Sequence, residues 1–280
     1  MKICKSLEDL TMFQAQVRGL ERTLALIPTM GALHEGHLDL MRKAKLDGHI
    51  CLATIFVNPM QFAAHEDLEI YPKTFDEDVK KLRSVGVEGV FAPTNDLMYP
   101  KGESTRVNIG ELGQKWEGMD RPHFFEGVAT IVAKLLIIGK ADTAYFGEKD
   151  FQQLQIIKKL TKDLLISTKI IGCSTRRDPD GLALSSRNTY LTSEERKIAP
   201  YLQSEMITAR DRIISGQEID SVLKGAKENL KNLGFSLISY LAYVDAETMT
   251  KQDALIKKGF GRLIAAATLG STRLIDNLAI

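Results

Sequence analysis

The chain has 280 residues, a length that allows one large domain or two smaller ones. Its 37 lysines and arginines nearly balance 36 aspartates and glutamates, which leaves no broad positive charge for nucleic acid or an anionic membrane. Hydrophobic residues make up 44% and charged residues 26% of the chain, as is typical of a soluble globular enzyme.

The N-terminal segment "MKICKSLEDLTMF" contains neither a long apolar stretch nor a small-residue cleavage site, so it does not predict a secretory leader. The longest apolar run, 50–57, has the length of a strand and is far shorter than the ~20 residues of a membrane helix. The cysteines, Cys4, Cys51 and Cys173, are isolated and form no CxxC pair, which favours a reducing compartment. We therefore expect a cytoplasmic protein.

Short apolar runs alternate with longer amphipathic runs over the first 175 residues. The predicted strands are 23–29, 50–58, 89–93, 142–147 and 166–175, and the predicted helices are 36–48, 75–86, 127–140 and 150–164. In the first helix we expect Leu38, Met41 and Leu46 to face inward. Such alternation predicts an α/β fold with a doubly wound, Rossmann-like parallel sheet, whose ligands bind beyond the carboxyl ends of the strands.

The character of the sequence changes near residue 176, at the segment "RRDPDGLALSSRN", which is rich in glycine, proline and charge. Long helical patterns follow at 193–215 and 218–233, and strand patterns follow at 236–248 and 261–277. We therefore predict a Rossmann-like domain over 1–175 and a smaller α+β domain over 176–280.

Two histidines, His34 and His37, stand three residues apart in "PTMGALHEGH", where a predicted strand gives way to a helix. The zinc motif H-E-x-x-H needs a spacing of four, and the other histidines, His49, His65 and His123, are scattered, so a metal site is disfavoured. Ordinary loop histidines are the plainest alternative. However, free amides at a helix N-terminus bind anions, and imidazoles three residues apart point to the same side. The pattern therefore favours a phosphate site.

"PTMGALHEGH" resembles the HxGH signature of the nucleotidyltransferase superfamily. Further motifs resemble those of one family within it, pantothenate synthetase (pantoate–β-alanine ligase), and follow the family order. They are "FVNPMQF" (56–62), "YPKT" (71–74), "MYP" (98–100), "GEKDFQQL" (147–154), "DGLALSSRN" (180–188) and "RLIDN" (273–277). The resemblance covers almost the whole chain. It implies the ATP-dependent condensation of (R)-pantoate with β-alanine to pantothenate through a pantoyl adenylate, with release of AMP and pyrophosphate.

The resemblance also implies a set of site residues. Catalytic roles fall on His34, His37, Lys149, Ser185, Ser186 and Arg187. ATP contacts fall on Met30, Gly31, Ala32, Leu33, His34, Glu35, Gly36, His37, Gly147, Glu148, Lys149, Asp150, Arg176, Leu184, Ser185, Ser186 and Arg187. Gln61 and Gln153, which are neutral and can both donate and accept hydrogen bonds, suit pantoate, and Gln61 also faces β-alanine in the family. Without the resemblance, each of these motifs has a plainer interpretation. "SSRN" is typical of a linker between domains, Lys149 and Asp150 of a charged pair on the surface, and the two glutamines of side chains exposed to solvent.

ATP use implies Mg²⁺, whose ligands the sequence does not identify, because Mg²⁺ commonly binds through substrate phosphates. The acidic run 76–78 fits either an outer contact to the metal or the N-terminus of a helix. The expected partners are pantoate, β-alanine and ATP, with no nucleic acid and no membrane. The family is typically dimeric, so we expect a homodimer.

The chain departs from the family pattern at a few positions. The family motif R-P-x-H-F-x-G is represented by 121–127, where Phe124 stands at the histidine position and His123 stands one residue earlier. Arg176 replaces a small aliphatic residue, Leu184 a common methionine, and Trp116 a leucine.

Two alternative functions remain at this stage. In a nucleotidylyltransferase of the same superfamily, a substrate phosphate attacks ATP, which calls for an extra cation, whereas Gln61 and Gln153 are neutral. In a regulatory protein, the nucleotide site would persist without catalysis, and Phe124 and Arg176 favour that alternative.

Overall fold

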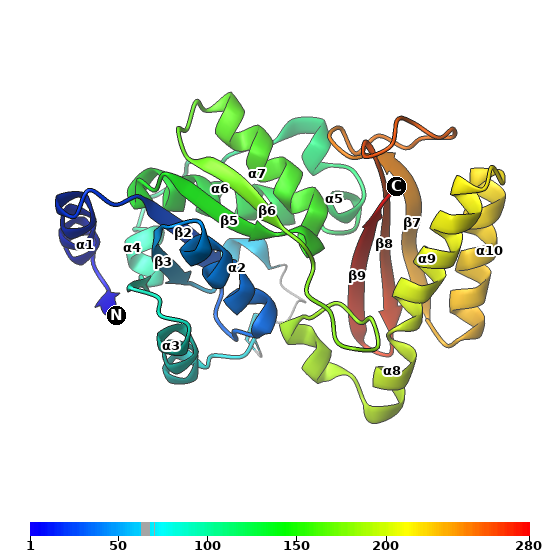
Figure 1. The fold of residues 1–280 in the computed structure, drawn as a ribbon, viewed down its shortest axis with the longest axis horizontal. Coiled ribbons are helices and arrows are strands. Elements are labelled where there is room, and N and C mark those ends of the chain that lie inside the picture. The colour runs from blue at the N-terminus through cyan, green and yellow to red at the C-terminus, as the bar shows by residue number, and fades with distance from the viewer. Residues whose placement is uncertain (63–67, 70) are drawn as a thin grey trace.

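The computed structural model describes residues 1–62, 68–69 and 71–280, so His65 lies outside the described residues. The predicted α/β fold is confirmed: a six-stranded parallel sheet with helices around it stands beside a three-stranded antiparallel sheet (Figure 1). Within the described part of the chain, no helix is both long enough and apolar enough to cross a membrane.

The parallel sheet has the strand order β1-β4-β3-β2-β5-β6. Its strands are β1 (Lys2–Cys4), β2 (Leu24–Thr29), β3 (Ile50–Ile55), β4 (Gly89–Phe91), β5 (Thr143–Gly147) and β6 (Lys169–Cys173). The inner strands are almost entirely apolar because helices cover both faces of the sheet. From β2 the chain moves outward to β3 and β4 and then returns to place β5 on the other side of β2. The strand order therefore reverses between β2 and β5, and that is where such sheets bind ligands.

The helices that surround this sheet include all four that the sequence predicts. They are α1 (Leu7–Gly19), α2 (Glu35–Leu46), α3 (Phe75–Ser84), α4 (Asn95–Met98), α5 (Glu117–Asp120), α6 (Phe124–Gly139) and α7 (Phe151–Asp163). Three short 3₁₀ turns are η1 (Pro59–Gln61), η2 (Gly110–Gly113) and η3 (Glu148–Asp150). In α2, Leu38 and Met41 are buried as expected, but the prediction for Leu46 was wrong: it is 83% exposed. Leu46 is the last residue of the helix and lies beyond the sheet contact.

The C-terminal part packs two helices against one face of an antiparallel sheet (Figure 1). Its elements are η4 (Ser186–Tyr190), α8 (Ser193–Ile198), α9 (Tyr201–Ile214), α10 (Ile219–Asn232), β7 (Leu237–Asp245), β8 (Gly261–Leu269) and β9 (Thr272–Ala279). Pro200 divides the predicted helix 193–215 in two, because proline does not fit a helix interior. Gly270, at φ +58°, turns the predicted run 261–277 into a β8–β9 hairpin. The division into domains at residue 176, in the link after β6, stays a prediction.

Candidate active site

The carboxyl ends of β2 and β5 open onto two cavities that share several lining residues. The smaller cavity, of about 230 Å³, lies over the turn between β2 and α2, and the larger, of about 730 Å³, lies toward the antiparallel sheet. Residues that line both are Arg121, Phe124, Lys149, Asp150, Gln153, Ser185 and Arg187. The structure thus brings residues from three of the sequence motifs, far apart along the chain, to one continuous space.

His34 and His37 stand together at the N-terminus of α2, as the sequence predicts. His34 is the residue before the helix, and its backbone N–H donates to Nδ1 of His37 at 3.3 Å. Because Nδ1 of His37 accepts this bond, the ring proton of the neutral imidazole is on Nε2. The two ring centres are 4.0 Å apart, and both rings line the smaller cavity.

Both imidazoles are neutral near pH 7. Burial lowers the pKa of His34 to about 4 and that of His37 to about 3, and the positive charge of Lys149 acts in the same direction. A neutral histidine donates a hydrogen bond without adding charge. The pair therefore supplies polarity to an anion, and the cationic groups of the site lie elsewhere.

These lowered values predict that folding stability depends on pH. The unfolded histidine, with its ordinary pKa of 6.5, binds protons before the folded one does, so stability falls as the pH drops from about 6.5 toward 4. We expect this fall to be shallower in His37→Asn, because one depressed pKa is removed. Urea-unfolding midpoints between about pH 7 and pH 4.5 measure both slopes, and equal slopes would contradict the assignment.

A buried carboxylate, Asp78 of α3, holds the turn that precedes the histidines. Its two carboxylate oxygens accept from the backbone N–H of Ala32 at 2.9 Å and of Leu33 at 2.8 Å, and the Thr74 hydroxyl donates to it at 3.1 Å. Gly31 has φ +86° and Ala32 has φ +50°, so two consecutive residues are left-handed. The acidic run 76–78 therefore has a third role that the sequence did not reveal, which is to brace this turn.

Gly36 leaves room for the ring of His34 against the first turn of α2. A Cβ atom there would lie 3.0 Å from Cε1 and 3.1 Å from Nδ1 of His34, tighter than ordinary contact. Glu35 is exposed and pairs with Arg42 at 2.8 Å, so its side chain does not enter the cavity. Met30 lines the smaller cavity.

The segment "GEKD" begins at Gly147, the last residue of β5, continues as η3 and lies near the histidines. Lys149 lines both cavities, and its ammonium lies 3.7 Å from the Asp150 carboxylate, which is 45% exposed. Gly147 lines the smaller cavity. Glu148 points away and pairs with Arg262 of β8 at 3.1 Å, so its side chain serves the contact between the sheets.

The segment "SSR" approaches from the C-terminal part. Leu184 N–H donates to the Arg176 carbonyl at 2.9 Å, which folds 176–184 into a loop that delivers Ser185. All three side chains of 185–187 line the smaller cavity, and Ser186 Oγ lies 3.4 Å from the Tyr71 hydroxyl. The charge of Arg176, unexplained from the sequence, pairs with Asp39 of α2 at 3.3 Å.

Two neutral polar residues, Gln61 and Gln153, also line the smaller cavity. Gln61, in η1, donates from Nε2 to the Met30 sulfur at 3.1 Å and accepts from Asn58 Nδ2 at 3.1 Å. Gln153 lines the cavity, whereas its neighbour Gln152 is buried and bonded to backbone. The cavity is therefore lined by Gln153, the glutamine that the family resemblance assigns to pantoate, and not by Gln152.

Phe124 stacks against an arginine, whereas a histidine at this position could also donate or accept a hydrogen bond. The Arg121 guanidinium stacks on the Phe124 ring at 3.8 Å and donates to the Gln61 carbonyl at 3.1 Å. His123, immediately before α6, is exposed and lines neither cavity.

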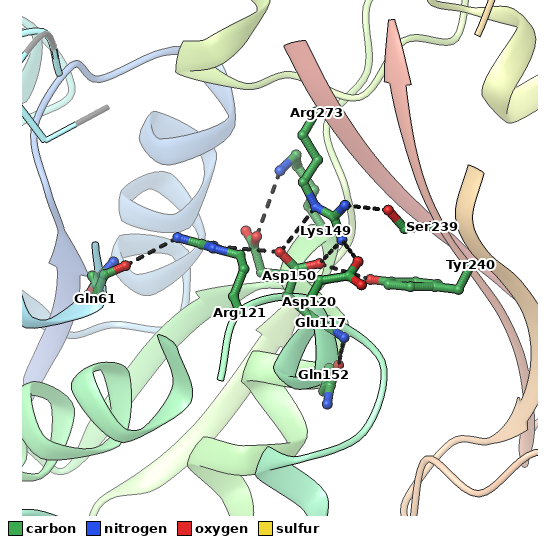
Figure 2. Close-up of polar contacts among 10 residues, drawn as sticks. All are labelled: Gln61, Glu117, Asp120, Arg121, Lys149, Asp150, Gln152, Ser239, Tyr240 and Arg273. Carbon is green, nitrogen blue, oxygen red and sulfur yellow. Dashed lines mark hydrogen bonds and ion pairs between the residues drawn. The ribbon is translucent and has the colours of Figure 1, made fainter. Parts of the chain in front are cut away.

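An ionic cluster on the larger cavity escaped the sequence prediction (Figure 2). Arg273 of β9 donates to Glu117 at 2.7 Å, to Asp120 at 2.6 Å and to the Ser239 hydroxyl at 2.6 Å. The Tyr240 hydroxyl also donates to Glu117, and burial beside this carboxylate raises the pKa of Tyr240. Glu117 and Asp120 stand more than 100 residues from Arg273 and Tyr240, so no local pattern reveals the cluster.

The smaller cavity lies where the strand order of the parallel sheet reverses, between β2 and β5. It is lined by the histidine pair at a helix N-terminus and by a lysine and an arginine. Together these features define a nucleotide-binding α/β enzyme of the HxGH type. Comparisons with known proteins identify the family. The profile described as Pantoate-beta-alanine ligase matches residues 2–279. The chain is 46% identical over 278 residues to the pantothenate synthetase of Dinoroseobacter shibae, covering 99% of each chain. It is 45% identical over 280 residues to that of Rhizorhabdus wittichii, covering 100% of this chain and 99% of the other.

Solved structures agree. The pantothenate synthetase of Thermus thermophilus superposes with a TM-score of 0.92 at 38% identity and covers 100% of this chain and 99% of its own. The pantoate–β-alanine ligase of Francisella tularensis, complexed with β-γ ATP and β-alanine, gives a TM-score of 0.83 at 34% identity over 100% and 97% of the two chains. The chain belongs to the pantoate–β-alanine ligase family.

Proposed function

We propose that this protein is an AMP-forming acid–amino-acid ligase that joins pantoate to β-alanine. The observation that carries the proposal is one cavity lined by the neutral histidine pair, by Lys149 and Arg187, and by the neutral glutamines Gln61 and Gln153. Arg121 also lines this cavity, where it donates to the Gln61 carbonyl and stacks on Phe124. The family match over residues 2–279 favours a carboxylate acceptor.

The first step forms pantoyl adenylate. A pantoate carboxylate oxygen attacks the α-phosphorus of ATP, the α–β phosphoanhydride bond breaks, and pyrophosphate leaves with the electron pair. Nε2–H of His37 donates to a phosphate oxygen as negative charge gathers there, and the α2 N-terminus adds its amides. Lys149 and Arg187 offset the repulsion between the two anions, and Ser185 and Ser186 add hydroxyl donors.

The second step forms the amide. The neutral amine of β-alanine attacks the acyl carbon, AMP leaves with the electron pair of the broken acyl–phosphate bond, and the amine nitrogen gives up one proton to water. Gln61 and Gln153 bind the pantoyl hydroxyls without adding charge, and Gln61 also faces the amine. Asp150 accepts from ribose hydroxyls, and the backbone of 176–184 lies along the adenine. The reaction needs no enzyme nucleophile, since positioning and electrostatics suffice.

Mg²⁺ accompanies ATP in this proposal. Within the described ranges, no group of three or more His, Cys, Asp or Glu side chains converges on a common point. The carboxylates that line the two cavities have cationic partners: Asp150 lies 3.7 Å from Lys149, and Glu117, Asp120 and Asp276 pair with arginines. The residues therefore fit a metal that would be held mainly by phosphate oxygens and would neutralise their charge.

The remaining assignments belong to the same proposal. The protein works in the cytoplasm as a homodimer, in line with its free cysteines and its family. The part from residue 176 onward closes over ATP by carrying Ser185, Ser186 and Arg187 toward α2.

The deciding experiment is isotope exchange between pyrophosphate and ATP, with and without pantoate. We expect exchange only when pantoate is present, and AMP release when β-alanine is added. Exchange that requires a phosphorylated acceptor would indicate a nucleotidylyltransferase. ATP binding without any exchange would indicate a regulatory protein.

The Asp78 brace gives a testable prediction. In Asp78→Asn, one of the two carboxylate acceptors becomes an NH₂ group that faces a backbone N–H, so we expect about 10-fold lower kcat/KM for ATP and a loss of about 1–3 kcal/mol of stability. Asp76→Asn, an exposed change in the same turn of α3, is the matched control. Exchange kinetics and urea unfolding measure both effects, and equal behaviour of the two variants would exclude the brace.

A further inference from the structure

The motif "RLIDN" on β9 includes a buried asparagine whose contacts the proposed reaction leaves unexplained. Asn277 is 4% exposed, and its Nδ2 donates to the Glu148 carbonyl at 2.8 Å and to the Lys149 carbonyl at 2.9 Å. One side chain of the antiparallel sheet thus uses both amide hydrogens on consecutive carbonyls of η3, the turn that carries the phosphate-binding lysine.

Arg262 of β8 fixes the orientation of this amide. Its Nε donates to Asn277 Oδ1 at 2.7 Å, and its terminal nitrogen pairs with the Glu148 carboxylate at 3.1 Å. The guanidinium also stacks on the Phe151 ring at 3.7 Å, at the first residue of α7. If the amide were reversed, its oxygen would face two carbonyls and its nitrogen a guanidinium, so only one orientation satisfies all partners.

We propose that Asn277 is the positioning residue for Lys149, so that docking of the antiparallel sheet sets the place of the phosphate-binding ammonium. This inference rests on the proposed function, since it assigns Lys149 to phosphate. The ammonium itself has a loose local tether, 3.7 Å from Asp150, so the backbone that carries it determines its reach into the cavity. The η3 backbone is held from outside its own sheet by Asn277.

The chemistry of the contact requires an amide. In Asn277→Asp, a carboxylate oxygen replaces Nδ2 beside the two carbonyl oxygens, which converts two attractions into repulsions although the side chain keeps its size. In Asn277→Ala, both donors are lost without repulsion. Both changes release η3, and we expect Asn277→Asp to have the larger effect.

A double-mutant cycle tests the proposal. In the otherwise unchanged chain, Asn277→Ala should lower kcat/KM for ATP in pantoate-dependent exchange by about 10- to 10²-fold, because catalysis is sensitive to displacements of about 1 Å. In a Lys149→Ala background, the same change should cost less than about 3-fold, since the group that it positions is absent. Binding of a β,γ-methylene ATP analogue, measured by calorimetry, gives the same cycle where exchange is too slow.

Controls separate positioning from general damage. Asn229→Ala truncates an exposed amide on α10 and should change neither rate nor melting temperature. Arg262→Lys keeps a positive charge near Glu148 but loses the bond to Asn277, so it should reproduce a weaker form of the same rate loss even if Asn277→Ala folds poorly.

Equal fold-losses with and without Lys149, or no loss in its presence, would overturn the inference while leaving the proposed function intact. Absence of pantoate-dependent exchange in the unaltered chain would overturn the proposed function itself, so the two failures are distinguishable.

Discussion

Replacing His37 by alanine should lower the turnover of pantoate adenylation by roughly 10²–10³-fold, the usual effect of removing one preorganised donor from a developing oxyanion. His37 lines the cavity, and its Nδ1 accepts from the His34 N–H, which leaves Nε2–H as the donor that the ring can offer. Such a donor gains strength only as charge accumulates on phosphate. The affinity for ATP should therefore change much less than turnover does.

The measurement is pyrophosphate exchange at saturating ATP and pantoate. The matched control is His49→Ala, because His49 bonds to Thr23 outside the cavity and should leave turnover unchanged. The pH profile supplies an independent test: a pKa of about 3 keeps His37 neutral above about pH 4, so this residue should contribute no ionisation to the rate between about pH 5 and 8. Turnover of His37→Ala within a few-fold of the unaltered chain would exclude His37 as the key donor.

The sequence predicts the part of this site that depends on local pattern. Buried parallel strands are continuous apolar runs, which the sequence shows directly. "PTMGALHEGH" carries both its turn glycine and its histidines within ten residues, so the strand end, the turn and the histidine pair are all predictable from this one stretch. The neutrality of the histidines could not be predicted. It follows from burial, and from the charge of Lys149, more than 100 residues along the chain.

Contacts between distant segments account for what the sequence did not reveal. Asp78 looks like one of three acidic residues at a helix start, and only the docking of α3 makes its carboxylate the buried partner of Ala32 and Leu33. The roles of Asn277 and Arg273 likewise depend on the packing of β9 against η3 and α5. The contact at Phe124 is local by comparison, since the guanidinium that covers its ring belongs to Arg121, three residues earlier.

Among the substitutions that we predict to alter stability, Gly127→Ala should cause the largest loss. Gly127→Ala places a Cβ atom 2.3 Å from the Met60 carbonyl oxygen and 2.8 Å from the Gln61 backbone nitrogen. Both are backbone atoms, and the Gly127 carbonyl is also tied to Asn58 Nδ2 at 3.1 Å, so neither α6 nor η1 can yield easily. Overpacking of this kind costs about 1–3 kcal/mol or more, and we expect about 3 kcal/mol here.

Gly225, a second glycine within a helix, provides the control for Gly127→Ala. Gly225 lies within α10 with no atom within 4 Å of its would-be Cβ, so Gly225→Ala should stabilise the protein by about 0.5–1 kcal/mol through helix propensity. Gly127 has the same propensity gain, and the difference between the two variants in urea unfolding therefore isolates the collision with η1. Because η1 carries Gln61, Gly127→Ala should also raise the KM for pantoate, whereas Gly225→Ala should not. If both changes stabilised the chain alike, the turn 59–61 would have to move freely away from α6, and the position of Gln61 would not depend on this glycine.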